Sequence, residues 1–174
     1  MTTTAPAAPK LTSQTWTGHW HGYGPWAGSP TVYAKEGSRR PPHPVRPATE
    51  ANHATRYQEA AGEFATSSLP PLMSGHWLAK EGRTAADRTW TDVTDVVQWL
   101  ERHYIDQPPF ERTDGLRAYV GLEVKVAYAY DVLPRGVDVA WIHYTQSRNL
   151  FSASIVCFPN LFHPDLPCPL LPRG

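Results

Sequence analysis

The sequence has few cysteines, no long apolar run and no excess of charge of either sign. Cys157 and Cys168 are the two cysteines among 174 residues, too few for a disulfide framework, or for a zinc ribbon without histidine ligands. Sixteen Lys and Arg residues balance sixteen Asp and Glu residues, so no positive field attracts nucleic acid or an anionic membrane surface. We therefore expect neither partner.

Membrane and secretion signals are missing as well. No stretch approaches the roughly 18 apolar residues of a membrane-spanning helix. Residues 1–14 are small and polar and lack the apolar segment of a secretory signal; they predict a flexible lead before a single globular domain over residues 15–174. The expectation is a soluble, cytoplasmic protein, and the prevalence of Arg, Ala and Pro is typical of a bacterial one.

Signature motifs of nucleophilic and nucleotide chemistry do not occur either. The chain has no G-x-S-x-G, no H-E-x-x-H, no phosphate-binding loop and no dinucleotide fingerprint. Whether the protein is an enzyme, and which cofactor it uses, stay open. We interpret Cys157 and Cys168 as reduced structural thiols, with a disulfide that anchors the C-terminal tail as the alternative.

What the sequence does contain is a strong β-type alternation. From Ala118 to Val132 every second residue is apolar, a turn follows at residues 133–136, and alternating stretches continue at 137–146 and 150–158. We therefore predict a three-stranded antiparallel meander over residues 117–158. A helix over residues 92–104 is predicted from the apolar stripe formed by Val93, Val96, Val97, Leu100 and Tyr104.

These elements predict an α+β fold that is mainly β. A curved antiparallel sheet or partial barrel packs against the helix at 92–104. A shorter helix is expected within residues 48–64, a proline-rich loop at 38–47, and an apolar C-terminal strap from residue 160 onward.

The two-residue alternation in the predicted strands places several aromatic side chains on the inner face of the sheet. His143 points inward with them, and its reference pKa near neutrality suits acid/base chemistry. We therefore predict a site for a hydrophobic or aromatic small molecule, in a binding protein or a biosynthetic enzyme with His143 as the catalytic residue. The predicted ligand-binding residues are Tyr128, Tyr130, Trp141 and Phe151.

Two alternatives stay open. Seven Trp residues and proline-rich arms are also typical of a non-catalytic subunit of a larger assembly or of a homo-oligomer, because interface cores favour Trp and Tyr. The other alternative is a metal-binding protein: His19 and His21 are two residues apart on a predicted strand, so both imidazoles face the same side. A third ligand would come from His76, His143 or His163.

The first strand carries one resemblance to a known family. Gly18-x-Trp20-x-Gly22-x-Gly24 resembles the opening strand of the nitrobindin-like haem barrels. The resemblance covers residues 18–24, and it implies a sheet that closes in the manner of a barrel.

Overall fold

The fold is built around an antiparallel sheet, which the computed structural model describes together with the rest of residues 15–42 and 51–173. Its strands are β1 (His19–Gly28), β2 (Thr89–Trp90), β3 (Val139–Tyr144) and β4 (Leu150–Phe158), in the spatial order β2-β1-β4-β3. The predicted lead at 1–14 and residues 43–47 of the predicted loop lie outside the described residues.

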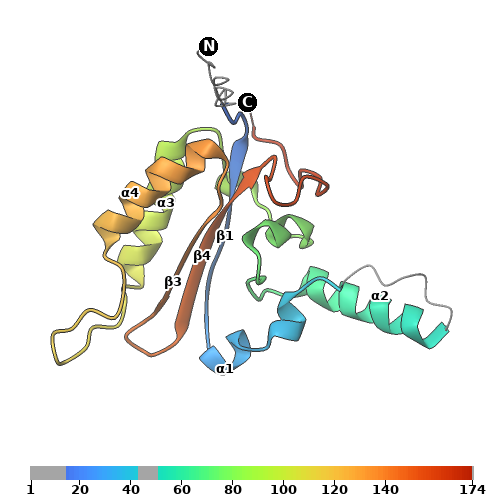
Figure 1. Cartoon of the computed structure of the whole chain (residues 1–174), viewed down its shortest axis with the longest axis horizontal. Coiled ribbons are helices and arrows are strands. Elements are labelled where there is room, and N and C mark those ends of the chain that lie inside the picture. Colours follow the sequence, from blue (N-terminus) through green and yellow to red (C-terminus); the bar gives the residue numbers. More distant parts are fainter. Residues whose placement is uncertain (1–14, 43–50, 174) are drawn as a thin grey trace, which may run out of the picture.

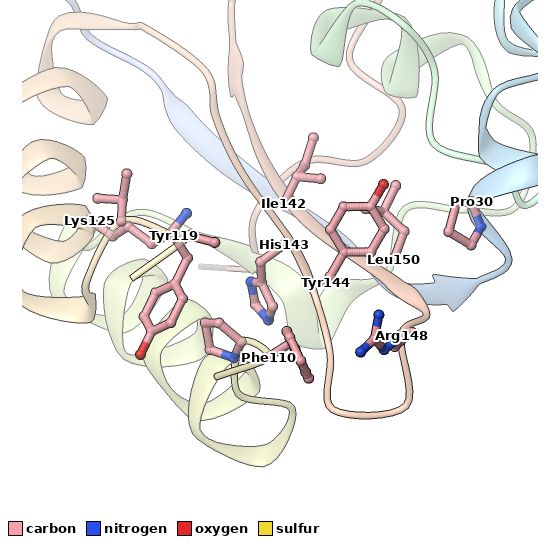
Figure 2. A pocket seen from close by; sticks show the side chains of 12 residues that line it. Pro30, Phe110, Tyr119, Lys125, Ile142, His143, Tyr144, Arg148 and Leu150 are labelled. Atoms are coloured by element: carbon pink, nitrogen blue, oxygen red, sulfur yellow. The ribbon is translucent and has the colours of Figure 1, made fainter. Parts of the chain in front are cut away.

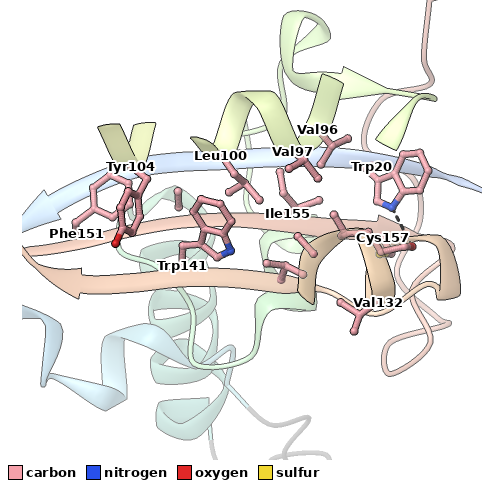
Figure 3. Close-up of a cluster of buried hydrophobic side chains, with 14 residues drawn as sticks. Trp20, Val96, Val97, Leu100, Tyr104, Val132, Trp141, Phe151, Ile155 and Cys157 are labelled. Atoms are coloured by element: carbon pink, nitrogen blue, oxygen red, sulfur yellow. Dashed lines mark hydrogen bonds between the residues drawn. The ribbon is translucent and has the colours of Figure 1, made fainter. Parts of the chain in front are cut away.

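Helices α3 (Val93–Asp106) and α4 (Leu122–Val132) cover one face of this sheet (Figure 1). The side chain of Asp92 accepts a hydrogen bond from Thr94 N at 2.7 Å and so caps the start of α3. Val96, Val97, Leu100 and Tyr104 are buried against the sheet (Figure 3). The predicted helix at 92–104 and its apolar stripe are confirmed.

Helix α4 corrects the prediction of a meander over residues 117–158. The first predicted strand is an irregular segment followed by a helix, so the fold is mixed α+β with more helix than strand. The alternating stretch also carries apolar residues at helical spacing, and these are the ones that pack on the core: Leu122, Val126, Ala129 and Leu133. Most of the remaining apolar residues of the alternation, such as Val124 and Tyr128, are exposed, whereas Val132 at the end of α4 is buried in the core.

The other two predicted strands are confirmed as the hairpin of β3 and β4. The prediction placed His143 opposite Ala153, whereas it pairs with Phe151, and Trp141 pairs with Ala153. Because the shift is two residues, every side chain keeps its predicted face. Strand β4 is central in the sheet, with β1 on its other side, and is buried along almost its whole length.

The sheet is open, with β2 and β3 at its edges. The predicted partial barrel, and the barrel-like closure implied by residues 18–24, are therefore wrong. Strand β2 pairs with β1 and strand β3 pairs with β4, and the two edge strands do not pair with each other.

The second face of the sheet is contacted by a short 3-10 segment. Helix α1 (Pro30–Tyr33) and helix α2 (Ala51–Thr66) precede a 3-10 segment, Ser74–Ala79, whose Trp77 and Leu78 pack on Tyr23 and Val156. Helix α2 confirms the helix expected within 48–64. In the part of the chain described, no helix is both long and apolar enough to cross a bilayer.

Candidate metal centre

The centre begins with two histidines on β1. His19 and His21 are alternate residues, so their imidazoles project to the face opposite Trp20. The ring centroids are 4.8 Å apart and the rings are nearly perpendicular. His21 is fully buried and His19 is 8% exposed. Trp20 points into the α3 and α4 side, where its Nε1 donates to Leu133 O at 3.2 Å (Figure 3).

The C-terminal strap brings a third group to the same place. Buried Asn160 fixes its start, because its Nδ2 donates to both carboxylate oxygens of Asp138 at 3.0 Å and its Oδ1 accepts from His163 N at 3.0 Å. Leu166 then packs against the cluster around Tyr23 and Trp77. Two residues further on, Cys168 lies beside the two histidines.

The strap is less buried than its composition predicts. Leu161, Phe162 and Leu171 are each more than half exposed, so apolar burial alone does not hold it in place. Its path depends on Asn160, on the partly buried Leu166 and on the contact of Cys168 with β1.

The distances within this cluster suit a single metal ion. Cys168 Sγ lies 3.3 Å from His19 Nε2 and 3.7 Å from His21 Nε2. Tetrahedral zinc, with Zn–S near 2.3 Å and Zn–N near 2.0 Å, sets the N···S separation at about 3.5 Å. All three ligand atoms lie within 4.8 Å of one another. Little movement is needed to bring them around one ion.

Thr89 on β2 fixes the tautomer of His21. Its hydroxyl donates its single hydrogen to Ala85 O at 2.9 Å. The 3.0 Å contact between Thr89 Oγ1 and His21 Nδ1 therefore has Nδ1–H as the donor. The lone pair of His21 is then on Nε2, the nitrogen that faces Cys168.

Burial keeps both histidines neutral. Burial, and to a smaller degree the neighbouring His19, lower the pKa of His21 to about 4. Burial also lowers the pKa of His19. Metal ions bind the neutral imidazole, so both rings are in the ligating form at neutral pH.

The structure brings together two of the residues predicted for metal binding and replaces the third. His143 lies on the opposite face of the sheet, and His76 packs against His163 with tilted rings whose centroids are 4.2 Å apart; neither belongs to the cluster. Sequence reasoning missed Cys168 because it lies 147 residues from His21, and no spacing motif spans that separation. The one signal in the sequence was that Cys168 is the single cysteine of the strap, and a thiolate is a ligand that metal ions such as zinc prefer.

Both cysteines are free thiols, so the alternative of an anchoring disulfide is wrong. Cys157 is fully buried on the α3 and α4 side, where burial and Asp138 raise the pKa of its thiol. The Cys157 thiol therefore stays protonated, and its role is to pack in the hydrophobic core. Cys168 is partly exposed, and its thiol donates to Leu170 O at 3.1 Å.

The residues predicted for an aromatic ligand site do not share one cavity. Tyr128 and Tyr130 lie on α4 and are 55% and 40% exposed, whereas Trp141 and Phe151 are buried in the core. His143 is buried on the inner face, as predicted, and packs on Phe151 and Tyr104. Whether any of them binds a ligand stays a prediction.

No family model, curated protein or solved structure was found to match this chain.

Proposed function

We propose that this protein binds a divalent transition metal ion, Zn²⁺ in the first place, through His19 Nε2, His21 Nε2 and Cys168 Sγ. The observation that carries the proposal is the convergence of these three atoms, from a central strand and a distant strap, at separations of 3.3 and 3.7 Å around the thiol. Such separations match a tetrahedral N,N,S set.

The ligand types favour zinc over harder and softer ions. Mg²⁺ and Ca²⁺ take oxygen ligands, and no carboxylate belongs to the ligand group found in the described part of the chain. Two imidazoles and one thiolate form a set of intermediate softness, which suits Zn²⁺.

Among the residues described, three ligands converge, and this set leaves the fourth tetrahedral position for water or another small ligand. Zinc sites that are purely structural fill all four positions with protein atoms. Because Cys168 is partly exposed at the surface of the strap, the fourth position faces the accessible side of the site. The proposed role is therefore a metal site that accepts an exogenous ligand and also ties the strap to β1.

The test is metal stoichiometry in matched variants of the tag-free protein. After dialysis against Zn²⁺, native mass spectrometry of wild type is expected to show one ion per chain. His21→Asn keeps an N–H that reaches toward Thr89 but loses Nε2, and Cys168→Ser loses the thiolate. Each should weaken zinc affinity by more than about 100-fold, because a ligand is worth more than the 10- to 100-fold typical of its supporting contacts.

The controls are a histidine and a cysteine outside the cluster. His103, which packs on Trp99, and Cys157 in the core are changed in His103→Asn and Cys157→Ala, and both variants should keep wild-type zinc affinity. A wild-type chain that holds no zinc, or ligand variants that hold it as well as the controls do, would refute the proposal.

The other functions expected from the sequence stay predictions. A role as a subunit of an assembly agrees with the exposed apolar side chains Val124, Tyr128, Ile142 and Tyr144 on α4 and β3. Binding of a small apolar molecule near His143 is one of these predictions.

A further inference from the structure

A cavity of about 710 Å³ lies beside the free edge of the β3–β4 hairpin. Its walls come from the segment before α4, from β3 and from the turn that joins β3 to β4. Figure 2 shows His143 in the middle of this set, between Tyr119 and Tyr144, with Phe110 below it. The volume falls in the range of roughly 300–1,000 Å³ found for small-molecule sites.

The cavity has apolar walls and two cations. Phe110, Ile142, Tyr144 and Leu150 contribute apolar surface, and within the described part of the chain no acidic residue lines the cavity. Lys125 is half-buried and forms no ion pair among the residues described. Arg148 lies with its guanidinium 4.7 Å from the centre of the Phe110 ring. An apolar cavity with two unneutralised cations favours an apolar anion.

His143 adds an unused hydrogen-bond acceptor. Its side chain is 6% exposed, and its Nε2 lies 2.7 Å from Gln107 O. Because a carbonyl can only accept, Nε2 carries the hydrogen and Nδ1 carries the lone pair. That Nδ1 is buried and has no hydrogen-bond partner. Buried polar atoms are nearly always paired, so an unpaired acceptor at the wall of a cavity indicates a ligand that donates to it.

We propose that this cavity binds a small apolar carboxylic acid that also carries a hydroxyl or amino group. Lys125 and Arg148 attract the carboxylate, and His143 Nδ1 accepts a hydrogen bond from the neighbouring donor. The hydrocarbon part lies against Phe110 and Ile142. The site is separate from the metal centre, since His143 faces α3 and α4 whereas His19 and His21 face the other side of the sheet.

Three probes of nearly equal size separate these contacts. 3-Phenyllactate has the carboxylate and the hydroxyl, 3-phenylpropionate lacks the hydroxyl, and 3-phenylpropionamide lacks both the charge and the hydroxyl. Each is titrated into isotope-labelled protein, and the signals of Ile142, His143 and Leu150 are followed by NMR. The expected order of affinity is phenyllactate, then phenylpropionate, then the amide, with about tenfold between the charged and neutral probes because charged hydrogen bonds are the stronger ones.

Two variants assign the preference to the proposed residues. Lys125→Met should remove most of the preference for phenylpropionate over the amide, whereas the exposed Lys35→Met should leave it unchanged. His143→Phe should remove the preference for phenyllactate over phenylpropionate. If this core variant does not fold, the lysine pair still decides.

Three results would overturn the proposal. They are phenyllactate leaving the lining signals unmoved, the amide binding as tightly as phenylpropionate, and Lys125→Met behaving like Lys35→Met. None of these results depends on whether His19, His21 and Cys168 hold a metal, so the two proposals fail independently.

Discussion

At the scale of residues, the proposed metal centre depends on the hydroxyl of Thr89. It accepts from His21 Nδ1–H while it donates to Ala85 O, so it orients the ring and sets the tautomer. Thr89→Val keeps the shape of the side chain and removes both hydrogen bonds. We expect zinc affinity to fall by about 10- to 100-fold, the usual effect of losing such a supporting contact, as measured by competition with a chromogenic chelator.

Thr84→Val is the matched control for this change. Thr84 is hydrogen-bonded to the hydroxyl of Tyr23 at 2.8 Å on the same face of the sheet, but it touches no proposed ligand. Equal losses of zinc affinity in Thr84→Val and Thr89→Val would show that general loosening of this face, and not the His21 tautomer, governs binding.

Lys80 gives a second prediction at this scale, on stability against pH. Its side chain is buried, and its Nζ donates to Phe64 O at 2.8 Å and to Ser67 O at 3.1 Å. Burial, with a smaller effect of Arg83, lowers its pKa from 10.5 to about 8. At a pH between about 8 and 10.5, Lys80 is protonated in more of the unfolded chains than of the folded ones. Its contribution to stability therefore rises with pH over this range.

The measurement is urea unfolding of wild type and Lys80→Met at pH 7.5 and pH 10. The free energy of unfolding of wild type, relative to the variant, should increase by about 1–3 kcal/mol over this interval. The comparison with Lys80→Met cancels the titration of other groups. A difference that stays constant or decreases with pH would mean that the burial of Lys80 does not lower its pKa.

Two of the three ligands of the proposed metal site could be predicted from the sequence, and the third could not. The spacing of His19 and His21 places both imidazoles on one side of any strand, so the pair was predictable. Cys168 is brought to them by Asn160 and Leu166 through contacts that join distant parts of the chain. Thr89 was equally hidden, because its role depends on the pairing of β1 with β2.

At the scale of elements, helix α3 was predictable and α4 was not. The sequence of α3 has a single helical periodicity, a capping Asp92 and apolar residues that, apart from the exposed Ile105, lie on one side. The stretch at 117–132 fits two periods at once, because Leu122, Val126 and Ala129 are at helical spacing within a strict alternation. Packing against α3 favours the helical pattern, and this contact is not encoded in the local sequence.

The turn that follows α4 gives a prediction about an element boundary. Gly136 has φ +79°, and a Cβ built there would lie 2.4 Å from Cδ1 of Trp16. Trp16 packs on the core and donates from Nε1 to Pro159 O at 3.1 Å. Gly136→Ala therefore strains the backbone and displaces Trp16.

Gly115→Ala is the control, because it measures the cost of backbone strain at a positive φ without any steric clash. Gly115 has φ +74° with no atom within 4 Å of the added Cβ, so its change should cost about 1 kcal/mol of unfolding free energy. Gly136→Ala should cost at least about 1 kcal/mol more, since a hydrogen bond and packing are lost too. Equal midpoints of denaturant unfolding in the two variants would show that Trp16 adjusts without loss.

At the scale of the whole molecule, the proposed metal centre and His143, which lines the cavity, lie on opposite faces of the sheet. Trp141, His143 and Phe151 face α3 and α4, whereas His19 and His21 face the strap. The expectation of an α+β protein is correct, and the expectation of a mainly β one is wrong because the described residues form more helix than strand and their sheet is not closed. The strap residue Cys168 reaches the central strand β1, and a bound metal would link the end of the described chain to the start of its sheet.

The most direct test of this account is X-ray absorption at the zinc edge of the tag-free, zinc-loaded protein. The account predicts two nitrogen scatterers of imidazole type at about 2.0 Å and one sulfur scatterer at about 2.3 Å, with the sulfur absent in Cys168→Ser. A spectrum of wild type with nitrogen and oxygen alone, or a sulfur shell that persists in Cys168→Ser, would contradict it.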